Sequence, residues 1–171
     1  KRARALLEKP TSANRSTLTT AISNLGRLYS VQGRLEEAEQ MFGQAIDLDR
    51  KTYGDRSSMV ANHLRSLAET YQLAGNYRAA EQNYRRASDI YKRNGETGIV
   101  DGIQYDLATA YVAQGQYSKA APIITRMLPR MRAAYGQDFD GNGEFLRNLG
   151  LIERAGKRVA VGSDEWRAEY S

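Results

Sequence analysis

The sequence has 171 residues, of which 41% are hydrophobic and 26% are charged, as expected for a globular protein that buries one sizeable core. It contains no cysteine and one histidine, which excludes disulfides and thiolate chemistry and nearly excludes a zinc site or a histidine-based nucleophile relay. The net charge is +5, but five basic side chains and one acidic side chain lie in residues 1–15. The rest of the chain is therefore nearly neutral, which argues against a nucleic-acid partner.

The predicted elements are helices along the whole chain. A short helix is expected at residues 2–8, and Pro10 with the following Thr11 and Ser12 should end it. Three helix pairs are then expected, at 16–32 with 34–53, 58–74 with 77–93, and 98–114 with 117–135. A last helix is expected at 143–155. A short closing helix is expected at 164–170, where Trp166 and Tyr170 share one face and could cover the end of the stack.

An internal repeat is the strongest signal in the sequence. Three segments align without gaps at the anchoring leucines Leu25, Leu67 and Leu107, and a weaker fourth copy has Leu149. Small residues follow these leucines, where a neighbouring helix must approach closely: Gly26, Ala68, Ala108 and Gly150. Glycines are expected to end the first helix of each pair: Gly33, Gly75 and Gly115. On the second helices, alanines should mark the crossing and larger side chains should fill the space between units: Ala38, Ala80, Ala120, Phe42, Tyr84 and Ile124.

This pattern resembles the tetratricopeptide repeat over roughly residues 16–156. The usual repeat has about 34 residues, and the longer units here are similar to the kinesin-light-chain class, which is also common in bacterial multidomain proteins. The resemblance implies an all-α fold, an α-solenoid of antiparallel helix pairs in a right-handed superhelix. The expected parts are a basic helix or linker at 1–15, units at 16–57, 58–96, 97–138 and 139–156, and a tail with a short capping helix at 157–171.

The resemblance also implies a protein-interaction scaffold rather than an enzyme, because in this family the first helices line a concave groove in which a partner usually lies. The positions that correspond to the groove are Asn24, Arg27, Arg65, Ser66, Glu69, Tyr105, Asp106, Thr109, Arg147 and Asn148. An asparagine before the anchoring leucine would hold a peptide backbone, because its amide both donates and accepts. Asn24 and Asn148 match this position, whereas Ser66 and Asp106 depart from it.

Arginines beside an aromatic side chain favour an extended peptide with some acidic character as the partner. The alternative is that these groove positions are solvated and that their charges pair along the helices. Two other functions stay open. The stack could form a homo-oligomer through its end repeats, as a self-assembling structural subunit, or it could be the regulatory or docking region of a larger multidomain enzyme.

Catalytic and metal-binding patterns are weak in this sequence. Asp138, Asp140 and Asn142 match the first half of a calcium loop, but the twelfth position holds Leu149, where a bidentate glutamate is required. An inter-repeat turn is therefore favoured over a calcium site. His63 is expected at the surface or half-buried on its helix. No G-x-x-x-x-G-K-[ST] loop is present, so we expect no cofactor, no catalytic residue and no metal.

No apolar run approaches the roughly 18–20 residues of a membrane span, so none is expected. The sequence begins at Lys1 without a methionine, and we expect either a piece of a longer protein or a chain processed at its front. A removed signal peptide is neither indicated nor excluded. The absence of cysteine suits both the cytoplasm and the bacterial envelope, and we slightly favour the cytoplasm.

Overall fold

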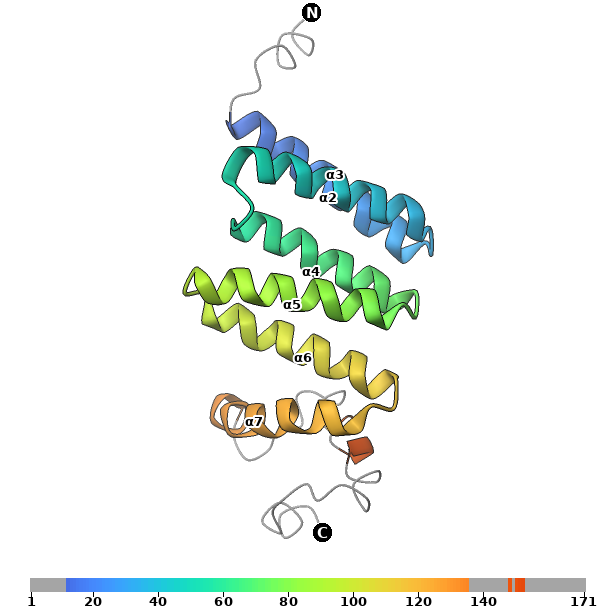
Figure 1. Ribbon diagram of the computed structural model, residues 1–171, viewed down its shortest axis with the longest axis vertical. Coiled ribbons are helices and arrows are strands. Elements are labelled where there is room, and N and C mark those ends of the chain that lie inside the picture. Colours follow the sequence, from blue (N-terminus) through green and yellow to red (C-terminus); the bar gives the residue numbers. More distant parts are fainter. Residues whose placement is uncertain (1–11, 136–147, 149, 153–171) are drawn as a thin grey trace, which may run out of the picture. The chain divides into compact units, whose positions relative to one another are not determined.

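The computed structural model describes residues 12–135, 148 and 150–152, and every regular element in this part of the chain is an α-helix. The helices are joined by short turns into antiparallel pairs (Figure 1). Their bounds are α2 Ser12–Val31, α3 Leu35–Tyr53, α4 Ser58–Leu73, α5 Tyr77–Arg93, α6 Thr97–Ala113 and α7 Tyr117–Tyr135. The contacts divide the chain into two compact units, the first ending at Asp106 and the second beginning at Leu107.

The helix bounds agree closely with the prediction except at the start of α2. This helix begins at Ser12 rather than at residue 16, so the expected limit of the basic segment at residue 15 lies inside a helix. Nothing between these positions breaks a helix, and Ala13 and Arg15 are good helix formers. The helices expected at 2–8 and 164–170 lie outside the described residues, and of the helix expected at 143–155 only positions 148 and 150–152 are described, all of them helical.

The turn inside each helix pair has the same hydrogen bonds. Gly33, Gly75 and Gly115 adopt φ values of 74°, 74° and 69°, a left-handed conformation that side chains with a Cβ avoid. In the first turn the amide of Gly33 donates to the carbonyl of Ser30 at 3.0 Å, and the amide of Arg34 donates to that of Tyr29 at 2.9 Å. These two bonds satisfy the last carbonyls of α2 and reverse the chain. The predicted role of the three glycines is confirmed.

Small side chains let the helices of a pair approach closely. Five of the predicted alanines are completely buried: Ala38, Ala68, Ala80, Ala108 and Ala120. A Cβ at Gly26 would lie 3.2 Å from the Cβ of Met41 and 3.2 Å from the ring of Phe42. The larger side chains predicted between units are also buried, with Phe42 and Ile124 at 0% and Tyr84 at 1% exposure. Burial of these apolar surfaces is the main source of stability.

The anchoring leucine of the first unit departs from the prediction. Leu67 and Leu107 are 8% and 4% exposed, whereas Leu25 is 38% exposed. The face of α4 that carries Leu67 is covered by the preceding pair, because α4 contacts both α2 and α3. Among the described residues no helix precedes α2 in the sequence, so no equivalent pair covers its face.

We predict opposite outcomes for two Gly→Ala variants. Gly43→Ala should raise the free energy of unfolding by up to about 1 kcal/mol, because alanine favours a helix over glycine and no atom lies within 4 Å of the added Cβ. Gly26→Ala gains the same propensity but crowds the fixed Cβ of Met41 and the buried ring of Phe42. It should therefore be less stable than Gly43→Ala by about 1 kcal/mol or more. Urea denaturation measures both, and equal stabilisation would contradict the close approach.

Candidate functional site

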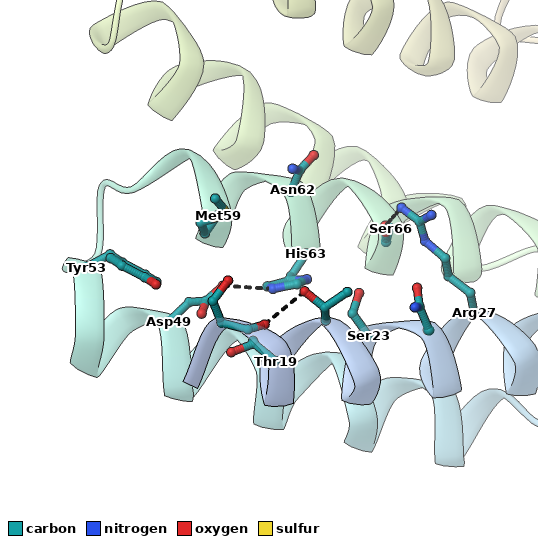
Figure 2. Close-up of a pocket in the computed structure, with 12 residues that line it drawn as sticks. Thr19, Ser23, Arg27, Asp49, Tyr53, Met59, Asn62, His63 and Ser66 are labelled. Atoms are coloured by element: carbon teal, nitrogen blue, oxygen red, sulfur yellow. Dashed lines mark hydrogen bonds and ion pairs between the residues drawn. The ribbon is translucent and has the colours of Figure 1, made fainter. Parts of the chain in front are cut away.

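A polar cavity of about 210 Å³ lies where the first helices of the first two pairs meet. Its walls come from one face of α2, the last turns of α3 and the first half of α4 (Figure 2). Of the predicted groove residues, Asn24 and Arg27 on α2 and Ser66 on α4 line this cavity. Arg27 reaches across the two helices, where its Nη2 donates to Oγ of Ser66 at 3.3 Å.

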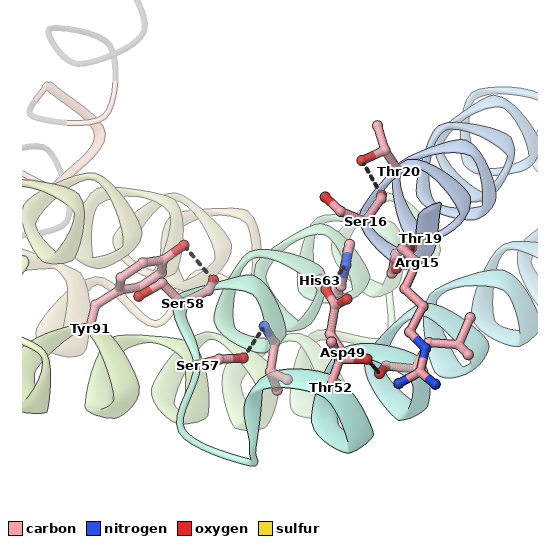
Figure 3. A network of polar contacts seen from close by, with 12 residues as sticks. Arg15, Ser16, Thr19, Thr20, Asp49, Thr52, Ser57, Ser58, His63 and Tyr91 are labelled. Atoms are coloured by element: carbon pink, nitrogen blue, oxygen red, sulfur yellow. Dashed lines mark hydrogen bonds and ion pairs between the residues drawn. The ribbon is translucent and has the colours of Figure 1, made fainter. Parts of the chain in front are cut away.

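Short hydroxyl side chains form the α2 wall. Ser16, Thr19, Thr20 and Ser23 lie on one face of the helix because they are three or four residues apart. Thr19 Oγ1 donates to the carbonyl of Arg15 at 2.6 Å, and Thr20 Oγ1 donates to that of Ser16 at 2.9 Å (Figure 3). Because both hydroxyls donate their hydrogen to a backbone carbonyl, their oxygens can act only as hydrogen-bond acceptors towards the cavity.

A buried pair of titratable side chains forms the cavity floor. His63 Nε2 lies 2.9 Å from Oδ2 of Asp49, and the two residues are 9% and 3% exposed. Burial lowers the pKa of His63, and the nearby charge of Arg27 lowers it further. The hydrogen bond and the charge of Asp49 raise this pKa, but burial outweighs them. The pKa of His63 therefore lies below the ordinary value of 6.5. His63 is therefore neutral at pH 7, and its Nε2–H donates to Oδ2 of Asp49.

The expectation that His63 lies at the surface or is half-buried was wrong. Alignment of the repeats contains a signal that predicts its burial, because His63 corresponds to Ile103 in the next unit, which is 0% exposed. The involvement of Asp49, Tyr53 and Met59 was also missed. Nothing in the repeat pattern indicates that the end of a second helix contributes to a site built mainly on first helices.

A second charged cluster joins α4 to α6. Arg65 Nη2 lies 2.7 Å from Oδ2 of Asp106, and its Nε lies 3.3 Å from Oε1 of Glu69. Desolvation and the charge of Asp106 raise the pKa of Glu69, whereas the charges of Arg65 and Arg27 lower it. Desolvation is the largest of these effects, so the pKa of Glu69 lies above its ordinary value. Three of the predicted groove residues thus contact one another, and the charge of Arg65 is already balanced inside the protein.

The other predicted groove residues that the structure describes are not among those that line the cavity. Tyr105 and Thr109 are both half-buried on α6. Tyr105 belongs to the first compact unit and Thr109 to the second. Asn148 is 1% exposed, so its amide is not open to a partner, contrary to the expectation that it would contact a peptide. Arg147 and the calcium-loop candidates Asp138, Asp140 and Asn142 lie outside the described residues.

Within the described ranges, 12–135, 148 and 150–152, no three histidine, aspartate or glutamate side chains gather as metal ligands would. None of the helices in these ranges combines the length and the apolar character that a membrane span requires.

Comparison with known proteins gives consistent similarities. Models of the tetratricopeptide repeat match residues 16–93 and 105–138. Protein KINESIN LIGHT CHAIN-RELATED 2 of Arabidopsis thaliana is 28% identical over 71 residues, which are 42% of this chain and 11% of that protein. The chain thus spans about a tenth of the length of this curated relative.

Two solved structures have a similar fold. BtubC (BKLC) from P. vanneervenii superposes with a TM-score of 0.70 at 21% identity, over 86% of this chain and 59% of that chain. A structure of nearly identical TPR-like repeats from Podosopora anserina superposes with a TM-score of 0.63 at 21% identity, over 81% of this chain and 65% of that chain. These likenesses confirm the predicted fold class, an all-α solenoid of helix pairs.

The pKa of His63 leads to a prediction about stability. The unfolded chain takes up a proton on this histidine at about pH 6.5, whereas the folded protein does so only at lower pH. As the pH falls through about 6.5, the unfolded state therefore binds more protons and the free energy of unfolding should decrease. Urea denaturation between about pH 7.5 and about pH 5.5 measures this loss.

The matched control is His63→Gln, in which this part of the pH dependence should vanish while the contribution of the carboxylates remains. A wild-type protein that gains stability over the same pH range relative to His63→Gln would mean that the pKa of His63 is raised, contrary to the geometry.

Proposed function

Because the chain belongs to the tetratricopeptide-repeat family, whose members are general protein-interaction scaffolds, we propose that it holds a peptide or protein partner along its first helices. The observation that supports this proposal is the cavity between α2 and α4, which brings Asn24, Arg27 and Ser66 to one surface. Asn24 is exposed and its amide can pair with a peptide backbone. A preformed surface of this kind keeps the cost of ordering on binding small.

The acidic character expected of the partner depends on which arginines are available. Arg65 is paired with Asp106 and Glu69, so a partner carboxylate would have to displace an existing ion pair. Arg27 is exposed, and its guanidinium donates a hydrogen bond to the neutral hydroxyl of Ser66. An acidic contact is therefore proposed at Arg27 alone.

A scaffold rather than an enzyme is proposed for the same reasons. The one buried histidine has its Nε2 bonded to Asp49, and no cysteine is available as a nucleophile. The polar side chains that line the cavity are hydroxyls, amides, one guanidinium and the bonded Asp49–His63 pair, which suit binding by hydrogen bonds and by charge.

We predict that Asn24→Ala and Arg27→Ala weaken peptide binding along the first helices. Peptides selected from a displayed library on the wild-type protein should bind both variants roughly tenfold or more weakly, the loss expected when a charge-assisted or buried hydrogen bond is removed. Calorimetric titration measures the affinities. Gln40→Ala is the matched control, because Gln40 is exposed on α3 and does not line the cavity. Equal binding by all three variants would overturn the groove assignment.

Self-association is a second candidate function, which a separate observation favours. The α2 face has three exposed leucines, Leu18 at 45%, Leu25 at 38% and Leu28 at 52% exposure. The corresponding residues of α4 are buried, at 1% for Val60, 8% for Leu67 and 2% for Thr70. An apolar face that is covered in one unit and open in another is suited to contact between copies of the chain.

If this face assembles copies of the chain, light scattering with size-exclusion chromatography should give a mass that rises with concentration. Leu25→Glu should return the protein to its monomer mass of 19.1 kDa, because the charge would be buried in the contact. Leu73→Glu is the control, since Leu73 is 72% exposed on a different helix. A wild-type mass of 19.1 kDa at every concentration would rule out self-association.

A further inference from the structure

The carboxylate of Asp49 gives the cavity a buried negative charge. Asp49 is 3% exposed, and its one side-chain partner among the described residues is His63. A neutral imidazole donates a hydrogen bond to the carboxylate but does not balance its charge. Burying an ionised group is costly unless a cation or several donors compensate for it. Among the described residues no lysine or arginine forms an ion pair with Asp49, and Arg27 acts on the pair only through its charge. A ligand could therefore supply the positive charge that is missing beside Asp49.

An aromatic ring and a thioether lie beside this carboxylate. Tyr53 follows Asp49 by one helical turn and lies on the same face of α3, and both line the cavity. Figure 2 shows Asp49, Tyr53 and Met59 towards one end of the cavity and Arg27 with Ser66 towards the other. Tyr53 is 43% exposed and Met59 is 49% exposed, so both present surface to an incoming group.

Each of these three side chains suits one part of a basic side chain. The carboxylate pairs with an ammonium or guanidinium group, and the tyrosine ring attracts the same cation through its face. The flexible thioether of Met59 packs against the aliphatic stem. The threonine hydroxyls of α2, whose protons are donated to the backbone, add acceptors for N–H donors.

From this arrangement we infer that the Asp49, Tyr53 and Met59 end of the cavity receives a lysine or arginine side chain of the partner. The inference rests on the proposed function, since it names the chemistry of a residue in the peptide that the first helices hold. An acidic side chain at this end would place its charge against the carboxylate of Asp49. Arg27 at the opposite end favours the reverse charge, so the cavity distinguishes the two directions of a peptide that carries both.

The single histidine of the chain reports the charge of whatever enters this end. The titratable and charged groups that line the cavity with His63 are Asp49 and Tyr53 from α3 and Arg27 from α2, and of these Asp49 and Arg27 act on the pKa of His63. A cation bound at Asp49 makes protonation of His63 less favourable and lowers its pKa, whereas a bound anion raises it. The direction of the change therefore identifies the class of ligand.

The test is an NMR titration of the His63 imidazole C–H signals in the full 171-residue chain. The probes are N-acetyl-argininamide, N-acetyl-norleucinamide as the neutral match, and N-acetyl-glutamic acid amide as the anionic match. We expect the arginine probe alone to shift the His63 signals saturably and to lower the pKa of His63. A response to the glutamate probe with a raised pKa, or no saturable response to the arginine probe, would overturn the inference.

Two variants locate the effect. Asp49→Asn, which keeps the size of the side chain, should abolish the response to the arginine probe. Tyr53→Leu leaves the buried pair intact and should weaken the probe by about two- to fivefold, the effect of losing a cation–π contact. Tyr53→Leu keeps the test decisive if Asp49→Asn does not fold, and an unchanged affinity in Tyr53→Leu counts against the site.

The small probes do not require a peptide partner, so the two proposals fail in different ways. If the selected peptides bind Asn24→Ala and Arg27→Ala as tightly as the wild-type protein, the proposed function is wrong, whatever the result with the small probes. If selected peptides bind through Asn24 but lack a basic residue and tolerate Asp49→Asn, the function stands and the basic-residue pocket is wrong.

Discussion

The close approach of the two helices in each pair is the constraint on which the rest of the structure depends. It favours small residues at Gly26 and Ala38, where an added Cβ at Gly26 would crowd Met41 and Phe42, and a turn that a left-handed glycine makes easily. This geometry fixes where the last turns of α3 lie, and therefore places Asp49 and Tyr53 beside α4. A larger side chain at the crossing would move the very residues that form the cavity floor.

The cavity itself arises where polar residues replace the core residues of the repeat. His63 takes a position that Ile103 occupies in the next unit, and a buried imidazole is tolerated only because Asp49 bonds to it. Short hydroxyl side chains on α2 then leave space that larger side chains would fill. The histidine, its partner Asp49 and the short hydroxyl side chains of α2 together make part of this interface a polar pocket.

Charge pairing decides which predicted residues are available to a partner. Arg27 and Arg65 stand at different positions of the repeat, and Arg65 is the one that forms ion pairs, with Asp106 and Glu69. Arg27 instead donates a hydrogen bond to the hydroxyl of Ser66, which is neutral and does not balance the charge of the guanidinium. Of the mixed set of charged groove residues expected from the pattern, Arg65, Asp106 and Glu69 form one balanced cluster in the folded protein, and Arg27 lies outside it.

The sequence by itself determined the helices, their turns and their small crossing residues, because these follow from local periodicity and from the backbone freedom of Gly33, Gly75 and Gly115. It also indicated Asn24, Arg27 and Ser66, since groove positions recur at a fixed place in each unit. Only the tertiary structure decided that the partner of His63 is Asp49, that Asn148 is enclosed, and that Leu25 is open. These outcomes depend on which side chains of other helices, distant in the sequence, pack against each residue. A repeat pattern gives the position of a residue within its unit but does not identify the residues that it contacts.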